Sequence, residues 1–385
     1  MEGKKSNTEE FAVLGRVVLK DEIIEDGAVV VADGRIKYAG RRDGCRLPAN
    51  VRDTKGKIIG PGFVDIHCHG GDEAAHESPE RMAEYHLEHG TTGLLCSLYR
   101  SLGHTKTMEA INKIKESMNT CKNILGVHME GPYLNPKYGA GYREAKLVKP
   151  VKEEYDEIIE SGIVKQWTFA PEIEGTDKFL EDITAAGIVP AIGHSEASPE
   201  RVREVCEKGV RIITHIFDAT GYSISPTRYE GTKEVSFDQS AMLCDNVYYE
   251  VICDKNGIHV RHDMIRLLIK TVGIDKVVAI TDCMKASKDD SDVNFDKGDL
   301  AGSKLTMLKV VRNFLRLGIS IPDVFKVASY NPSCAIGVDN IMGSLEPGKL
   351  ANIVIVDDDF GDVHLLSHFL PHAWKTGKCH ILYNI

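Results

Sequence analysis

The sequence predicts an α/β fold in which a (β/α)8 TIM-like barrel is inserted into a small β-sandwich domain formed by both ends of the chain. Eight short apolar runs, with helix start and stop signals between them, predict the barrel. Strand-and-turn patterning at both ends predicts the small domain. Such a barrel takes about 250 residues, so a chain of 385 residues has material left over. The predicted bounds are 1–57 and 340–385 for the small domain and 58–339 for the barrel.

The segment before the barrel alternates apolar and polar residues between positions 11 and 57, a pattern typical of strands. Asp33 and Gly34 interrupt it with a dipeptide that favours a tight hairpin turn. Residues 343–357 have the same strand-and-turn character. Because chain termini tend to lie close together, both ends can build one β domain around the inserted barrel.

The apolar runs of the middle segment are continuous rather than alternating, which indicates strands buried on both faces, as in parallel sheets. They span residues 63–66, 92–97, 124–127, 166–170, 188–193, 211–214, 247–252 and 277–281. Their number, eight, is the number of strands that closes a parallel barrel.

Helix signals lie between these runs. Ser198-Pro199-Glu200 combines an N-cap residue with a proline in the first turn, and Gly209 is a stop signal. Similar start and stop signals flank residues 78–90 and 176–187. Strand and helix therefore alternate with a period of about thirty residues, as βα units do.

Charge and composition exclude several classes of function. A formal net charge of −10 argues against a nucleic acid or an anionic membrane as the main partner. No apolar stretch approaches the ~18 residues of a membrane span, and residues 1–10 do not resemble a signal peptide. The ten cysteines form no C-x-x-C pair, so we expect reduced thiols in a cytoplasmic protein.

Potential ligands sit where the apolar runs stop, and the carboxyl ends of barrel strands form one common rim that carries the chemistry. These residues are His67, His69, Glu130, His194, His215 and Asp282. With 15 histidines in 385 residues, about half an H-x-H pair is expected by chance, so His67 and His69 alone are weak evidence for a site. The joint position of the whole set favours a site for a divalent transition metal, Zn, Fe, Mn or Co, because imidazole and carboxylate ligands suit these ions.

The segments that carry these residues resemble a known family. Residues 61–70, PGFVDIHCHG, are similar to the opening strand of the amidohydrolase superfamily, and Glu130-Gly131-Pro132 is similar to the E-G-P motif of its N-acetylglucosamine-6-phosphate deacetylases. Residues 193–195, 214–219, 254–259 and 281–282 follow in the family's order, so the resemblance spans nearly the whole chain.

The resemblance implies a metal site held by Glu130, His194 and His215. His67 and His69 would complete a second site with Glu130 bridging, so one or two ions are expected. Other superfamily members bridge two metals with a carboxylated lysine at the end of the fourth strand, where this chain has no lysine. Glu172, after that strand, is the less favoured acidic ligand.

The resemblance also implies roles in catalysis and substrate binding. Asp282 would take a proton from water and deliver it to the leaving nitrogen, although an isolated Thr-Asp after a strand is more often a helix N-cap. His259 would contact the substrate. Arg228 would bind the sugar phosphate, in its own or a neighbouring subunit of a homodimer, because guanidinium groups recognise phosphate through paired hydrogen bonds; otherwise it is a solvated loop charge.

Two departures from the family concern substrate binding. Gly141 lies where relatives carry a substrate-contacting histidine, and Asp218-Ala219 stands where they read Asn-Ala. A carboxylate near a phosphate repels it. Asp218 is therefore protonated, turned away, or paired with Arg228, Lys233 or Arg143, or the ligand lacks a phosphate and carries an amine or hydroxyl there.

The sequence thus predicts an amide hydrolase that removes the acetyl group from N-acetylglucosamine 6-phosphate. The alternatives are a related amidohydrolase acting on another N-acyl amino sugar, an N-acyl amino acid or a cyclic amide. A non-catalytic scaffold on the same fold is a third reading, which the complete set of rim residues disfavours.

Overall fold

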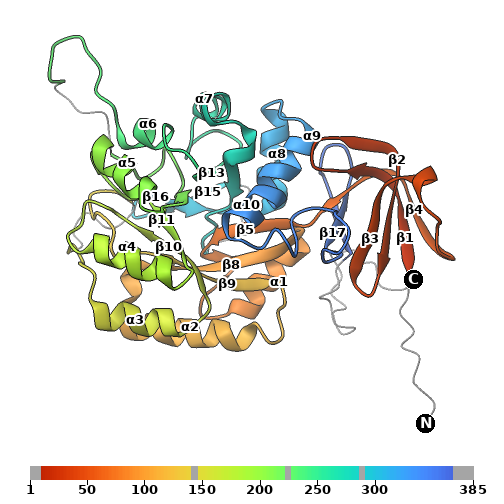
Figure 1. Cartoon of the computed structure of the whole chain (residues 1–385), viewed down its shortest axis with the longest axis horizontal. Helices are drawn as coiled ribbons and strands as arrows, with labels where there is room; N and C mark the ends of the chain where they lie inside the picture. Colours follow the sequence, from red (N-terminus) through yellow and green to blue (C-terminus); the bar gives the residue numbers. More distant parts are fainter. Residues whose placement is uncertain (1–9, 140–145, 222–226, 286–290, 367–385) are drawn as a thin grey trace.

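The computed structural model describes residues 10–139, 146–221, 227–285 and 291–366, which form a barrel and a separate β-sheet. In Figure 1 the barrel and its helices occupy the left and centre, and the sheet built from the two ends of the chain lies at the right. The predicted fold class, a barrel joined to a separate sheet from the termini, is confirmed.

The barrel sheet has eight parallel strands in the order β14-β13-β12-β11-β10-β9-β8-β5. Their bounds are β5 Phe63–Cys68, β8 Thr91–Tyr99, β9 Ile124–Glu130, β10 Val164–Phe169, β11 Val189–Ile192, β12 Ile212–Ile213, β13 Tyr248–Ile252 and β14 Val277–Ile280. All eight predicted runs are strands. Between β14 and β5 the backbone N–H of Asp282 donates to the carbonyl of His67 at 2.9 Å, so the ring of strands is nearly closed.

Helices cover the outside of the barrel (Figure 1). They are α1 Pro79–Glu88, α2 His104–Ser117, α3 Lys152–Glu160, α4 Thr176–Ala185, α5 Pro199–Glu207, α6 Phe237–Ala241, α7 His262–Val272, α8 Met307–Arg316, α9 Ile321–Phe325 and α10 Asn331–Ala335. The three helices predicted from their start and stop signals are α1, α4 and α5. At α5 the side chain of Ser198 accepts from the N–H of Arg201, which confirms the predicted N-cap.

Two short hairpins lie beside the carboxyl ends of the strands. One pairs β6 Gly70–Gly71 with β7 Ala74–Ala75, and the other pairs β15 Val293–Asp296 with β16 Asp299–Ser303. Cys283, just after β14, bridges both Cys68 and Ser303. The second hairpin is therefore attached directly to the rim of the barrel.

The sheet from the two ends has the order β18-β17-β4-β1-β2-β3. Its strands are β1 Phe11–Val18, β2 Ile23–Ala32, β3 Arg35–Arg41, β4 Asn50–Pro61, β17 Ile353–Val356 and β18 Val363–Leu366. Asp33 and Gly34 have φ of 55° and 69°, the left-handed pair that a type I′ turn requires, so the hairpin prediction is confirmed. The sheet encloses its own apolar cluster, which includes Val29 and Ile355.

The domain bounds at 57/58 and 339/340 stay a prediction. β4 continues past residue 57 to Pro61, which pairs with Ile353 of β17. Phe63, two residues further on, is already the first residue of the barrel. Sheet and barrel are thus joined through one continuous stretch of extended chain.

Phe325, at the end of α9, packs at this junction. Its ring stacks on Phe63 with centroids 5.9 Å apart and lies 5.7 Å from the ring of Phe360. Gly60 faces the same ring, and a Cβ at Gly60 would come within 2.3 Å of it. A side chain at position 60 would therefore push the sheet away from the barrel.

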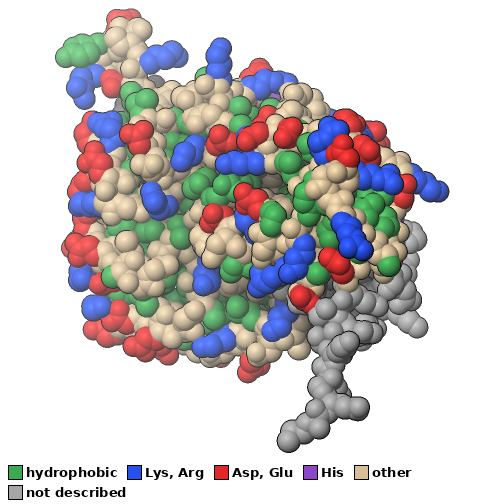
Figure 2. Space-filling model, turned by 45° about the vertical axis from the view of Figure 1, so that its right-hand side comes forward, with side chains coloured by type: hydrophobic (Ala, Val, Ile, Leu, Met, Phe, Trp, Pro, Cys, Tyr) green, Lys and Arg blue, Asp and Glu red, His purple; other side chains and the backbone are tan. Residues whose placement is uncertain are grey.

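No helix in the described ranges is long and apolar enough to cross a membrane. On the face shown in Figure 2, Lys and Arg side chains are interspersed with Asp and Glu side chains. That face therefore presents no continuous basic surface of the kind that binds nucleic acid.

We predict that Phe325→Ala lowers the free energy of unfolding by about 3–5 kcal/mol, because it leaves a cavity between Phe63, Phe360 and the sheet. Urea unfolding followed by circular dichroism measures the change. The control is Leu267→Ala on the exposed side of α7, where we expect a change within about 0.5 kcal/mol. Equal effects of the two substitutions would contradict the packing role of Phe325.

Candidate functional site

Strand ends place the six predicted rim residues at one mouth of the barrel. His67 lies in β5, His69 follows it, and Glu130 is the last residue of β9. His194, His215 and Asp282 come shortly after β11, β12 and β14, with φ of 46°, 27° and 47°. Left-handed backbone is uncommon for residues other than glycine and costs of order 1 kcal/mol or more at each position. Three such residues at one site indicate that side-chain direction there is fixed at the expense of local strain.

The side chains form two buried groups that share Glu130. In the first group, Nε2 of His69 lies 3.2 Å from Glu130 Oε2 and 3.2 Å from Nε2 of His67. In the second, Nε2 of His194 and of His215 lie 2.9 and 3.1 Å from Glu130 Oε1, and 3.0 Å from each other. The structure therefore brings together all five predicted metal ligands.

The outer nitrogens of three of these rings show where their hydrogens are. Nδ1 of His194 lies 3.1 Å from the carbonyl of Tyr138, and Nδ1 of His215 lies 3.1 Å from the carbonyl of Asp218. Nδ1 of His67 lies 3.0 Å from the carboxylate of Glu250. Since these oxygens only accept, each Nδ1 carries a hydrogen, so Nε2 is the nitrogen of each ring that faces inward and can hold a proton or a metal ion.

Inward lone pairs and a carboxylate repel one another unless a cation lies between them. Ligand atoms about 2.0–2.2 Å from a tetrahedrally bound Zn²⁺ are spaced about 3.4 Å apart, close to the 2.9–3.5 Å found here. Outer hydrogen bonds that fix a histidine ring are the usual support of a metal ligand. The residues thus fit one divalent ion in each group, with Glu130 shared.

The pKa shifts at the site show that protons and metal ions compete for the same lone pairs. Burial alone would raise the pKa of Glu130, but the neighbouring rings of His194, His215 and His67 lower it well below its usual range. Burial would lower the pKa of His215, yet Glu130 raises it to about 9. Glu130 is therefore a carboxylate, and a metal ion must displace the proton that His215 holds at Nε2.

Asp282 lies against the first group, with Oδ1 3.5 and 3.4 Å from Nε2 of His67 and His69. The alternative reading of Asp282 as a helix N-cap is wrong. The next residue, Cys283, pairs with strand residues on both sides, and the next described helix begins only at Met307.

A cavity of about 540 Å³ opens over the metal ligands. Its walls include Tyr99 from β8 and Phe295, Asp296 and Leu300 from the β15–β16 hairpin. A second cavity of about 430 Å³ adjoins it and shares Gly139, Asp218, Ala219 and Leu300. The combined volume of the two cavities is larger than the reacting amide group occupies, so the cavities can also hold the rest of a substrate.

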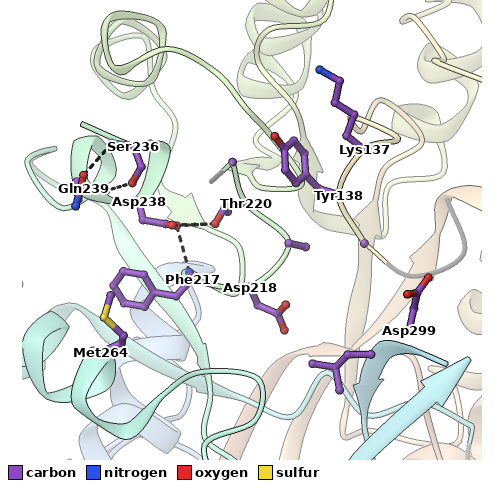
Figure 3. Close-up of a pocket in the computed structure, with 14 residues that line it drawn as sticks. Lys137, Tyr138, Phe217, Asp218, Thr220, Ser236, Asp238, Gln239, Met264 and Asp299 are labelled. Atoms are coloured by element: carbon purple, nitrogen blue, oxygen red, sulfur yellow. Dashed lines mark hydrogen bonds between the residues drawn. The ribbon is translucent and has the colours of Figure 1, made fainter. Parts of the chain in front are cut away.

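Figure 3 shows the second cavity, into which Asp218 points. Asp238 is held by the hydroxyl of Thr220 and the N–H of Phe217, and burial raises its pKa to about 6. Asp299 lies on the opposite side of the opening. Among the described lining residues the single cation is Lys137, and its Nζ is 2.5 Å from Glu196. This cavity is acidic.

Asp218 pairs with a residue that the sequence did not suggest as its partner. Its Oδ2 lies 2.7 Å from Nδ1 of His259, whose Nε2 is 3.0 Å from the carbonyl of Gly302. Both acceptors require a donated hydrogen, so His259 is an imidazolium paired with the Asp218 carboxylate. Burial would lower the pKa of His259, but Asp218 raises it. The expected partners Arg228 and Lys233 do not pair with Asp218, and Arg143 lies outside the described residues.

The other predicted substrate residues are placed differently. Ala219 lines both cavities. Arg228 is exposed and does not line either cavity. Gly141 lies outside the described residues. Glu172 accepts from the hydroxyl of Ser195 and belongs to neither metal group, so its role as the alternative ligand receives no support.

Sequence reasoning missed Glu250, which holds the ring of His67 from inside the barrel. The available signal was a carboxylate in the middle of the otherwise uncharged strand 248–252. His128 is a strand residue whose two ring nitrogens are satisfied by the hydroxyls of Ser97 and Thr168. Burial lowers its pKa well below the usual range, so the ring is neutral.

Comparison with known proteins gives consistent matches. The sequence model of the Amidohydrolase family matches residues 58–376. The N-acetylglucosamine-6-phosphate deacetylases of Haemophilus influenzae and Bacillus subtilis are each 26% identical, over 95% and 89% of this chain and 99% and 92% of theirs. The crystal structure of the Pasteurella multocida N-acetylglucosamine-6-phosphate deacetylase superposes with a TM-score of 0.82 at 26% identity, covering 93% of this chain and 98% of that one.

We predict that His194→Ala weakens metal binding by more than about 100-fold, since removing a supporting residue alone costs 10–100-fold. Metal content after dialysis, measured by plasma mass spectrometry, and competition with a chelator test this. The control is His104→Ala, a histidine outside the barrel paired with Glu157. Equal metal retention in the two variants would rule out the proposed ligand set.

Proposed function

Because the chain belongs to the amidohydrolase family, we propose that it removes the acetyl group from N-acetylglucosamine 6-phosphate, giving glucosamine 6-phosphate and acetate. The chain is a hydrolase of an amide C–N bond. The observation that carries the proposal is the pair of buried ligand groups sharing Glu130 beneath a polar cavity. The substrate is the one named for the relatives that match along most of this chain.

Glu130, His194 and His215 would hold one divalent transition ion, and His67 and His69 would hold a second together with Glu130. A bound ion of this kind lowers the pKa of water and polarises a carbonyl oxygen. The charges support two ions. Glu130 and Glu250 are buried carboxylates with Asp282 beside them, and no lysine or arginine of the described ranges pairs with any of the three. Two divalent ions offset this charge.

Asp282 is the proton carrier. It takes a proton from the attacking water as the C–O bond forms, and gives that proton to nitrogen as the amide C–N bond breaks. Its carboxylate lies at the metal ligands and lines the cavity, so it reaches both the water and the scissile bond. The products are acetate and the free amine.

The sugar lies beyond the amide, against Ala219 and Asp218, and the buried ring of His259 lies behind Asp218. The imidazolium of His259 offsets the charge of Asp218, which lessens the repulsion between Asp218 and a phosphate. Arg228 binds the phosphate from the neighbouring subunit of a homodimer, and its exposed position away from the cavities of its own chain supports this. Gly141 is a tolerated departure from the family pattern.

A second candidate function is hydrolysis of another N-acyl amino sugar that lacks a phosphate. The acidic lining of the second cavity, Asp218, Asp238 and Asp299, favours it, since a phosphate dianion is repelled there while a hydroxyl or an ammonium group is not. An N-acyl amino acid, a cyclic amide and a non-catalytic scaffold are less favoured. The first two lack support from the relatives named above, and the scaffold does not explain the complete ligand set.

We place the protein in the cytoplasm, in keeping with its small metabolic substrate. The nine described cysteines are all free thiols, which fits a reducing compartment. Arg228 does not line either cavity of its own chain. The proposal that it binds the phosphate therefore includes a homodimer, in which Arg228 of one subunit reaches the cavity of the other.

We predict acetate release from N-acetylglucosamine 6-phosphate with kcat/KM of about 10⁴ M⁻¹s⁻¹ or more, within the usual range for enzymes. N-acetylglucosamine without phosphate, assayed on the same metal-analysed protein, should be far slower if Arg228 recognises the phosphate. The reverse preference would establish the second candidate and remove the phosphorylated sugar as substrate.

We predict that Asp282→Asn lowers kcat by at least about 100-fold, because the amide cannot take the proton of the water. Metal content should be unchanged, since the five proposed ligands remain. Asp263→Asn, an exposed residue in the first turn of α7, is the matched control. Near-normal turnover of Asp282→Asn would exclude this residue as the proton carrier.

A further inference from the structure

We propose that Glu250 is a positioning residue that sets metal affinity in one half of the centre, the half formed by His67 and His69. The proposal rests on the metal centre described above and not on the identity of the substrate. Glu250 is the middle residue of β13, and its side chain is fully buried inside the barrel.

The two oxygens of Glu250 have separate partners. Oε2 accepts from Nδ1 of His67 at 3.0 Å, and Oε1 accepts from Nε2 of Gln166 at 2.7 Å. Gln166 lies on β10, almost opposite in the barrel, and is itself fully buried. Glu250 therefore fixes the plane of the His67 ring and the tautomer that directs Nε2 at the metal position.

Burial makes this carboxylate depend on positive charge at His67. Among the ion pairs of the described residues, His67 is its single partner. An unpaired buried carboxylate is strongly disfavoured. A cation bound at Nε2 of His67 makes Nδ1–H a stronger donor and brings positive charge towards Glu250, so ion and carboxylate stabilise each other through the ring.

The other half of the centre is supported differently. Nδ1 of His194 and of His215 donate to the neutral backbone carbonyls of Tyr138 and Asp218. Among the described hydrogen bonds, the one contact of Glu250 with that half is to the backbone N–H of His215 at 3.4 Å, which does not touch its ring. A carboxylate thus supports a ligand ring in one half, and neutral groups support the rings in the other.

This asymmetry extends to His69. Its Nδ1 is buried and has no hydrogen-bond partner among the described residues. His128 and Tyr99 pack against the two rings, but in the half formed by His67 and His69 Glu250 is the one described side chain that forms a hydrogen bond with the outer nitrogen of a ligand ring. Removing its charge should weaken the ion of this half and leave the other ion in place.

Glu250→Gln tests the charge with little change of shape. The Oε1 atom of Gln166 has no partner in the described structure, so the Gln166 amide can turn and accept from the new amide at position 250. The substituted side chain then still accepts from His67. The double variant Gln166→Glu/Glu250→Gln keeps the same hydrogen bonds and the buried charge but moves that charge away from His67. It replaces the single variant in the experiment if the single variant folds poorly.

The measurement is Zn²⁺ and Mn²⁺ titration of the metal-stripped full chain in competition with a chelator. We expect the wild-type chain to bind two ions. In both variants one ion should bind within about twofold of its wild-type affinity and the other about 10–100-fold more weakly. The matched control is Glu157→Gln, the same change in a Glu–His pair on the outside of the protein, where Glu157 meets His104 at 2.7 Å.

Equal weakening of both ions, unchanged binding of both, or a wild-type chain that binds a single ion would each overturn the proposal. Failure of the proposed function is distinguishable from these results. A wild-type chain that binds two ions but hydrolyses neither sugar would remove that function and leave the role of Glu250 standing.

Discussion

The site depends on one electrostatic constraint: four imidazole rings meet around a single buried carboxylate, that of Glu130, with no lysine or arginine of the described residues among them. At least three of the rings present lone pairs inward, because their outer nitrogens already donate hydrogens to oxygen atoms. Protons or metal ions must lie between these groups. A divalent ion accepts four or more lone pairs at one point, whereas a proton is shared by two at most, so the convergence of several ligand atoms favours metal.

The barrel supplies this convergence because the carboxyl ends of its strands form one rim. Convergence alone does not aim the side chains, and the left-handed backbone at His194, His215 and Asp282 completes the geometry. Rigid packing beneath the rim holds these strained residues in place. Hydrogen bonds between side chains of the barrel interior add to this support, since Glu250 joins His67 to Gln166 and His128 joins Ser97 to Thr168.

Beside the metal ligands the opening of the site is acidic. The charge of Asp218 is matched by His259 in direct contact. Asp299, on the β15–β16 hairpin that borders both cavities, adds a further carboxylate across the opening from Asp218 (Figure 3).

The sequence determined the eight strands, the helices with clear caps, the sheet from both ends and the six rim residues, because hydrophobic period, capping and turn chemistry act over a few neighbouring residues. It could not identify the partner of Asp218 or the role of Glu250. His259 lies 41 residues from Asp218, and His67 lies 183 residues from Glu250. Such pairs arise only when the barrel closes and brings distant strands to one interior. Which polar groups share a proton or an ion is therefore decided by the tertiary structure, since electrostatic pairing depends on distance in space and not on distance along the chain.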